Sequence, residues 1–189
     1  MAATRPDRLH FTGNDEADEL LAREPFALLV GFALDQQVTV QTAFTGPLKL
    51  KQRLGTLDPG EIASTDPGRL LEAFREKPAI HRFPGSMAER VQTLASTVVD
   101  EYGGHAERVW RDAKDGDDLR RRIGALPGFG KMKVTALGAV LAKRFGVEAA
   151  QALVPGHHTL GDVDSAEALE DYQAKKRAYK ASLRAGKSS

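Results

Sequence analysis

The chain has 189 residues and a formal net charge of +1, and this length is enough for one hydrophobic core or two small lobes. It contains no cysteine, which excludes disulfides, zinc–thiolate sites and iron–sulfur clusters. No apolar run approaches the roughly 18 residues of a membrane-spanning helix, and the first ten residues lack the apolar core of a secretory signal. We therefore expect a cytoplasmic protein.

The composition favours helices. Alanine and leucine far outnumber isoleucine and valine, and they lose the least free energy on entering a helix, whereas β-branched residues favour strands. No six-residue stretch alternates cleanly between apolar and polar residues. The predicted fold class is all-α.

The N-terminal part reads as a loose end followed by two helices. The first dozen residues have no periodicity and are expected to be loose. Asn14 and Asp15 can cap a short acidic helix that ends before Pro25. The next helix is predicted to start at Pro25 and to lie buried, since FALLVGFAL is apolar nearly all round. Gly46-Pro47 is expected to break its pattern.

Capping signals mark the next helices. Asp58-Pro59 and Asp66-Pro67 each place a capping residue before a proline, which predicts two short helices. Ser86 and Glu89 have the spacing of a capping box. Behind them the apolar residues follow the helical period until Gly103-Gly104.

The segment 117–146 carries the clearest binding signal. Helices are expected from Asp117-Asp118 onward and from Lys131 to Gly146, joined by LPGFG. The glycines permit positive φ, and the open N–H groups of the second helix suit a phosphate. Residues 119–146 contain no acid and seven basic residues, namely Arg120, Arg121, Arg122, Lys131, Lys133, Lys143 and Arg144.

The helical pattern of apolar residues becomes less clear after Gly146. The segment 147–163 is mixed, and Asp164-Ser165 can cap a last helix. The chain then ends in KKRAYKASLRAGKSS, which has six basic residues and no acid and is expected to be a frayed, solvated tail.

Four segments resemble one family in order and spacing. LPGFG followed by a helix resembles the helix-hairpin-helix of the HhH-GPD superfamily of DNA-repair glycosylases, and LLVGFALDQQVTVQTA, DPGEIASTDPGRLLEAF and FPGSMAERVQTLASTVVDEYGG resemble its preceding helices. The resemblance covers residues 25–146 and is nearest to short bacterial members without an iron–sulfur cluster. It implies a two-lobed all-α fold. Residues 25–146 form the lobe with the hairpin (117–146), and residues 1–24 plus 147–189 form a small second lobe and the basic tail.

The resemblance also implies how DNA is held. Double-stranded DNA would lie across the cleft between the lobes. Either Gln37 or Gln36 would enter the base stack where a damaged base is flipped out. The hairpin would grip phosphate, and its carbonyls would hold Na⁺ or K⁺. The hairpin residues concerned are Leu126, Pro127, Gly128, Phe129, Gly130, Lys131 and Lys133.

The chain departs from the family at two positions. Met132 stands where strand-cleaving relatives have a lysine nucleophile, so efficient β-lyase activity is not expected. Relatives place a catalytic aspartate about eighteen residues further on, where this chain has Ala150. Asp162, the first aspartate beyond the hairpin, is the predicted catalytic carboxylate, and Asp164 and Glu148 are the alternatives.

These features predict a monofunctional DNA N-glycosylase that excises an alkylated or deaminated base and leaves an abasic site. The alternative is a non-catalytic protein that recognises distorted or damaged duplex, and a helical protein–protein adaptor is a third reading. No organic cofactor or iron–sulfur cluster is expected. The expected protein is a monomer in the cytoplasm, associated with the nucleoid.

Overall fold

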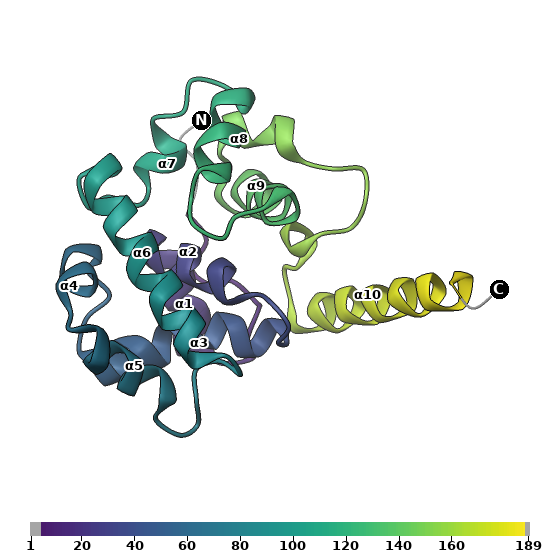
Figure 1. Ribbon diagram of the computed structural model, residues 1–189. Coiled ribbons are helices and arrows are strands. Elements are labelled where there is room, and N and C mark those ends of the chain that lie inside the picture. Colours follow the sequence, from purple (N-terminus) through teal and green to yellow (C-terminus); the bar gives the residue numbers. More distant parts are fainter. Residues whose placement is uncertain (1–4, 188–189) are drawn as a thin grey trace.

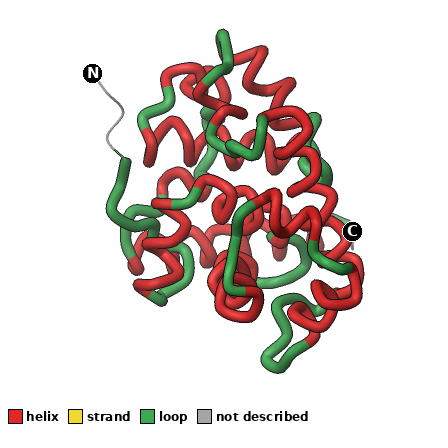
Figure 2. The backbone as a smooth tube through the Cα atoms, turned by 90° about the vertical axis from the view of Figure 1, so that its left-hand side faces the viewer, coloured by secondary structure: helices red, strands yellow, loops and turns green. Residues whose placement is uncertain are grey.

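The computed structural model describes residues 5–187, and these form helices and loops without a strand (Figures 1 and 2). The predicted all-α class is confirmed. Ten α-helices and two short 3-10 helices are described, in the order α1 (Asp15–Arg23), α2 (Pro25–Leu34), α3 (Val40–Leu54), α4 (Pro59–Ser64), α5 (Pro67–Arg75), α6 (Pro84–Tyr102), α7 (Arg108–Arg111), α8 (Gly116–Gly124), α9 (Lys131–Phe145), η1 (Glu148–Leu153), η2 (Leu160–Asp162) and α10 (Ala166–Gly186).

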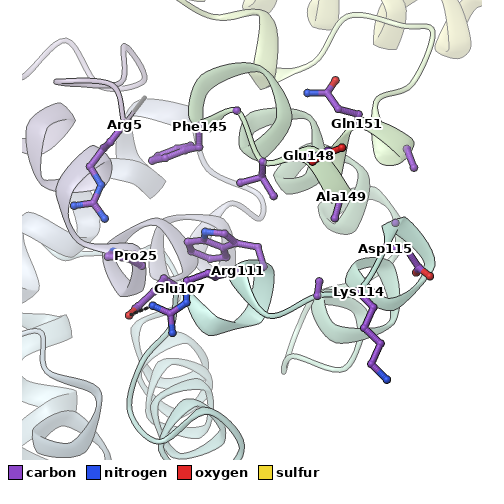
Figure 3. Close-up of a pocket in the computed structure, with 16 residues that line it drawn as sticks. Arg5, Pro25, Glu107, Arg111, Lys114, Asp115, Phe145, Glu148, Ala149 and Gln151 are labelled. Carbon is purple, nitrogen blue, oxygen red and sulfur yellow. Dashed lines mark ion pairs between the residues drawn. The ribbon is translucent and has the colours of Figure 1, made fainter. Parts of the chain in front are cut away.

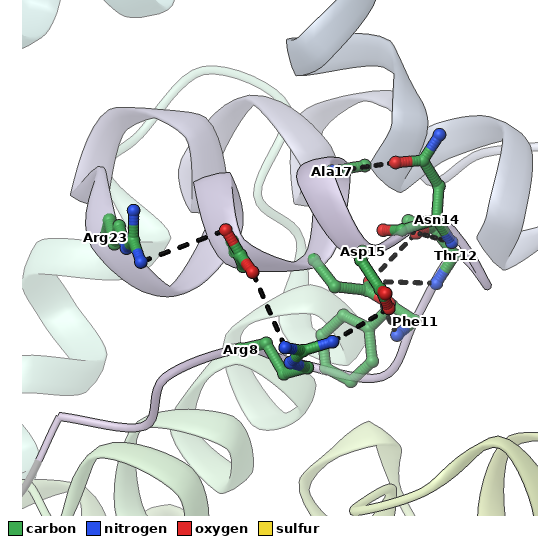
Figure 4. Close-up of polar contacts among 9 residues, drawn as sticks. Arg8, Phe11, Thr12, Asn14, Asp15, Ala17 and Arg23 are labelled. Carbon is green, nitrogen blue, oxygen red and sulfur yellow. Dashed lines mark hydrogen bonds and ion pairs between the residues drawn. The ribbon is translucent and has the colours of Figure 1, made fainter.

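The segment before α1 is packed, so the expectation of a loose N-terminal dozen is wrong for residues 5–12. Leu9 and Phe11 are fully buried, and the Phe11 ring packs edge-on against Phe44 with their centroids 5.0 Å apart. The buried carboxylate of Asp18 accepts the N–H groups of Phe11 and Thr12, both at 3.1 Å. Figure 4 shows Phe11 and Thr12 beside α1, with their polar contacts as dashed lines. Two apolar anchors and one carboxylate therefore fix a segment that has no periodic pattern.

The apolar helix predicted from Pro25 is two helices, α2 and α3. The chain leaves the helix at Asp35, and Thr39 caps α3 by accepting the N–H of Thr42 at 3.1 Å. The expected break at Gly46-Pro47 is wrong, because α3 runs through it. Gly46 lies against Leu34, where a Cβ atom would come within 2.5 Å of a methyl carbon. Close packing of α3 on α2 thus outweighs the local cost of the proline.

The helix starts at 59 and 67 are confirmed, and the start at 86 is wrong. The carboxylates of Asp58 and Asp66 accept the N–H groups of Glu61 at 3.0 Å and Arg69 at 3.1 Å. In contrast, α6 begins at Pro84 and has no side-chain cap. A proline in the first turn supplies the helical φ without a capping side chain, which moves Ser86 into the helix.

The hydrophobic core is built around α2, in which nine of the ten residues are buried. Helices α1, α3 and α6 pack around α2, and the short helices η1 and η2 pack against α9. Helix α1 contacts α2 and α3. In contrast, η1 contacts α8 and α9, and η2 contacts α9. The assignment of both segments to one second lobe stays a prediction.

Helix α10 projects from the body of the protein (Figure 1). Leu169 is its buried residue, and Gln173 exchanges hydrogen bonds with Gln41 of α3 at 2.7 and 3.2 Å. The helix continues through the basic segment to Gly186, so the expected fraying is wrong for residues up to 186. Within residues 5–187 no helix has the length and apolar character needed to cross a membrane.

Candidate nucleic-acid interface

The hairpin between α8 and α9 presents backbone to solvent. Leu126 and Phe129 are buried, and the Phe129 N–H donates to the Leu126 carbonyl at 3.1 Å. Gly128 and Gly130 are exposed, and Gly128 has a φ of +80°. Two predicted contact residues, Leu126 and Phe129, therefore hold the turn in place with their side chains, while the backbone at its two glycines stays exposed.

The N-terminus of α9 is open to an anion. Gly130 supplies no side-chain cap, so the first N–H groups of the helix have no side-chain acceptor there. Lys131 is exposed, and Met132 is 86% exposed. A phosphate bound here would meet backbone N–H groups, the positive end of the helix and the Lys131 ammonium.

The positive charge of residues 119–146 is partly neutralised by neighbouring acids. Asp117 pairs with Arg120 at 2.9 Å, and Asp118 pairs with both Arg121 and Arg122. Asp162 pairs with Lys143. These acids lie outside the stretch that the charge count covered, so the hairpin is less positive than the sequence indicated.

The two predicted intercalating glutamines lie in the loop between α2 and α3. Gln36 and Gln37 are both exposed. Gln37 has a φ of +57°, in the left-handed region that residues other than glycine rarely adopt. Such conformations persist where the surrounding structure enforces them and are common at functional sites.

The buried imidazole of His81 enforces this loop conformation. Its Nε2 lies 3.0 Å from both the Leu34 and Gln36 carbonyls, and its Nδ1 accepts the Phe83 N–H at 3.0 Å. This pattern requires a neutral ring with the proton on Nε2. Burial lowers the pKa of His81, which favours the same neutral form. Sequence reasoning gave no role to this histidine.

Arg90 of α6 connects the hairpin to the glutamine loop. Its Nη1 donates to Gln36 Oε1 at 2.7 Å. Its side chain also lies over Gly128, where a Cβ atom would be 2.8 Å from Arg90 Cδ. In the sequence, Arg90 is one basic residue within a predicted helix, and no sequence pattern indicates that its side chain points toward the hairpin.

We expect the Arg90→Ala variant to bind duplex DNA about three- to tenfold more weakly, because it loses a cation and the link between hairpin and loop. If Arg90 contacts phosphate, the slope of log Kd against log salt should become shallower by about 1. Fluorescence anisotropy at several salt concentrations measures both. Arg75→Ala removes the same charge from an exposed position on α5 and should change neither, and equal effects of both variants would contradict the prediction.

Lys133 faces α2 rather than phosphate or solvent. Its Nζ donates to the Ala33 carbonyl at 3.2 Å, and the side chain is half-buried. Burial and the nearby Arg90 charge lower the pKa of Lys133, whereas Asp35 opposes the change. The ammonium therefore sits at the C-terminal end of α2, next to the glutamine loop.

The predicted catalytic Asp162 is occupied by structural contacts. One oxygen accepts the Thr159 N–H at 2.9 Å in a reciprocal capping box, and the other pairs with Lys143. Burial alone would raise the pKa of Asp162, but the Lys143 and Thr159 contacts lower it overall. Lys143 follows Lys133 by ten residues, about 15 Å along α9.

The two alternative carboxylates lie outside the hairpin, on segments that follow α9. Asp164 is exposed directly before Ser165, which is the residue that caps α10. Glu148 lines an open pocket of about 1130 Å³ together with Trp110 and Phe145 (Figure 3). This pocket is at the C-terminal end of α9, about 21 Å along the helix from Lys131.

The structure thus brings the hairpin, the open N-terminus of α9 and the glutamine loop together through Arg90 and Lys133. This arrangement defines a helical DNA-binding protein of the helix-hairpin-helix type. The chain belongs to the HhH-GPD superfamily of base excision DNA repair proteins, whose family model matches residues 30–181. No curated protein and no solved structure matches the chain. Family membership makes DNA the partner and base excision repair the general function.

Proposed function

We propose that the protein is a monofunctional DNA N-glycosylase that removes an alkylated or deaminated base. The observation that carries this proposal is the link through Arg90, which joins the glutamine loop to the phosphate-binding turn. A protein that flips a nucleotide needs both parts in one rigid unit, because phosphate contacts fix the strand while a side chain fills the gap.

In the proposed reaction the duplex lies against Gly128–Gly130 and the first turn of α9. Gln37 or Gln36 enters the stack, where a planar amide can both stack on the neighbours and bond the orphaned base. The C1′–N bond then breaks and its electron pair leaves with the base, which takes a proton from solvent. Water adds to C1′ and gives up a proton, which leaves a free base and an abasic site.

A monovalent cation is part of the proposal. The Leu126 carbonyl accepts one N–H bond within the turn, and a carbonyl oxygen has a second lone pair for a ligand. Na⁺ or K⁺ held by this and neighbouring hairpin carbonyls would add positive charge beside the phosphate. The C1′ chemistry itself needs no group other than the chain and water.

The monofunctional assignment rests on Met132, and the Met132→Lys variant tests it. The helix N-terminus and the flanking lysines Lys131 and Lys133 would lower the pKa of a new amine at this exposed site and make it nucleophilic. We expect strand cleavage without alkali to rise at least about tenfold over wild type, through attack of the amine on C1′. Met132→Ala should keep cleavage dependent on alkali, and alkali-independent cleavage by the wild type would contradict the assignment.

The test of the function is single-turnover incubation with duplexes that contain an alkylated purine, hypoxanthine, uracil or an oxidised base. Products are resolved on denaturing gels with and without hot alkali. Cleavage of an alkylated or deaminated duplex only after alkali is the expected result. Binding of these duplexes without any excision would instead support a non-catalytic reader, and no binding at low salt would indicate an adaptor.

A further inference from the structure

Seven carboxylates among residues 5–187 are buried or half-buried. Six of them have a hydrogen-bond or ion-pair partner, namely Asp18, Glu19, Glu24, Glu107, Asp118 and Asp162. The seventh is Asp35, whose carboxylate makes no hydrogen bond or ion pair with any residue that the structure describes. Leaving a carboxylate partly desolvated without a partner costs folding free energy, and residues kept at such a cost are typical of functional sites.

Asp35 occupies the junction of the two DNA-binding parts. It directly follows α2 and directly precedes the two exposed glutamines. Lys133, from the first turn of the hairpin helix, reaches the carbonyl of Ala33 two residues earlier. Asp35 therefore lies where the glutamine loop meets α9 and α10, next to the hairpin and the glutamines that the proposed function assigns to DNA.

Positive and polar groups of α9 and α10 lie near this carboxylate without pairing with it. Burial raises the pKa of Asp35, and the charges of Lys176, Lys133 and Lys180 offset part of the rise. Tyr172 of α10 has its pKa raised to about 12 by burial and by the negative charge of Asp35. A carboxylate whose pKa lies above its usual value is better matched to accepting a proton near neutral pH.

The short separation of Asp35 from Gln37 along the chain suits a role for Asp35 at the sugar of the flipped nucleotide. When a base is flipped out, its sugar remains in the strand beside the gap that the inserted side chain fills. Asp35 and Gln37 are two residues apart, so their Cα atoms lie within about 7 Å of each other. A carboxylate there can reach C1′ of the flipped nucleotide, whereas the oxygens of Asp162 are engaged with Thr159 and Lys143.

We propose that Asp35, rather than Asp162, is the catalytic carboxylate of this protein. It stabilises positive charge on the sugar as the C1′–N electron pair leaves with the base. It then accepts the proton of the water that forms the C1′–O bond and releases this proton to solvent. Lys133 is a positioning residue that holds the C-terminal end of α2 against the hairpin. The proposal rests on the proposed glycosylase function and replaces the assignment of its catalytic residue.

The matched variants Asp35→Asn and Asp162→Asn test the assignment of the catalytic carboxylate to Asp35. Excision is measured under single-turnover conditions at saturating protein on the duplex that the wild type cleaves, together with duplex affinity and the unfolding midpoint. We expect Asp35→Asn to excise at least about 100-fold more slowly, to keep its affinity, and to unfold about 2–4 °C higher because it loses an unpaired charge. Asp162→Asn should excise within about threefold of wild type and unfold at a lower temperature, because its carboxylate loses the Lys143 and Thr159 contacts.

The outcomes separate this inference from the proposed function. Wild-type rates in Asp35→Asn, or loss of excision in Asp162→Asn alone, would overturn the assignment to Asp35 and leave the glycosylase function standing. A wild-type protein that binds these duplexes but excises no base would overturn both. A slow Asp35→Asn variant whose unfolding midpoint falls and whose affinity is lost would show that Asp35 has a structural role and would also overturn the assignment.

Discussion

Replacing Gly128 by alanine is expected to weaken duplex binding at least about tenfold, which corresponds to about 1.4 kcal/mol. The φ of +80° at this position costs an alanine about 1–2 kcal/mol. The new Cβ atom would also stand 2.8 Å from Arg90 Cδ and 2.9 Å from Arg90 Nε. Since the Arg90 side chain is flexible, it can move away, but it then leaves both the turn and Gln36.

Gly55→Ala is the matched control for this prediction. Gly55 has a φ of +78°, and a Cβ atom there would have nothing within 4 Å. Both variants should therefore lose a similar free energy of unfolding in urea denaturation, whereas Gly128→Ala alone should lose DNA affinity in fluorescence anisotropy. Equal affinities in the two variants would show that the contact between Arg90 and Gly128 does not support DNA binding.

Sequence patterns predicted the helical elements because their signals are local. The caps at Asp58 and Asp66 and the glycine ends at Gly103 and Gly146 depend on a few neighbouring residues. The continuation of α3 through Pro47 could not be predicted, because it depends on packing against Leu34. A local rule fails where a contact between distant segments has the larger free energy.

The sequence predicted the location of the candidate site but not all of the residues that contribute to it. The hairpin and the two glutamines have a spacing that can be recognised in the sequence. Arg90 and His81 act through contacts with residues 38–54 positions away in the chain, namely Gln36, Gly128 and Leu34. Asp35 was visible only as a residue next to the glutamines, because the lack of a partner can be seen only in three dimensions.

Replacing His81 by alanine is expected to lower the free energy of unfolding by about 3 kcal/mol, because three backbone groups lose their partner, each at about 1 kcal/mol or more. These groups are the carbonyls of Leu34 and Gln36 and the N–H of Phe83. The left-handed turn at Gln37 would then lose its support, so excision should fall together with stability. Urea denaturation and the gel assay measure the two effects. His105→Ala removes an exposed imidazole and should change neither.

The same imidazole should make stability depend on pH. Burial lowers the pKa of His81 in the folded protein below the usual histidine value of 6.5. The unfolded chain therefore takes up the proton first as the pH falls, so this contribution to stability is fully present above pH 6.5 and is lost as the pH falls from 6.5 through the folded pKa. His81→Asn can still donate to one carbonyl and accept from Phe83 but does not titrate. Its stability should fall less than that of wild type between neutral and mildly acidic pH, and parallel curves for the two proteins would show that His81 does not carry this dependence.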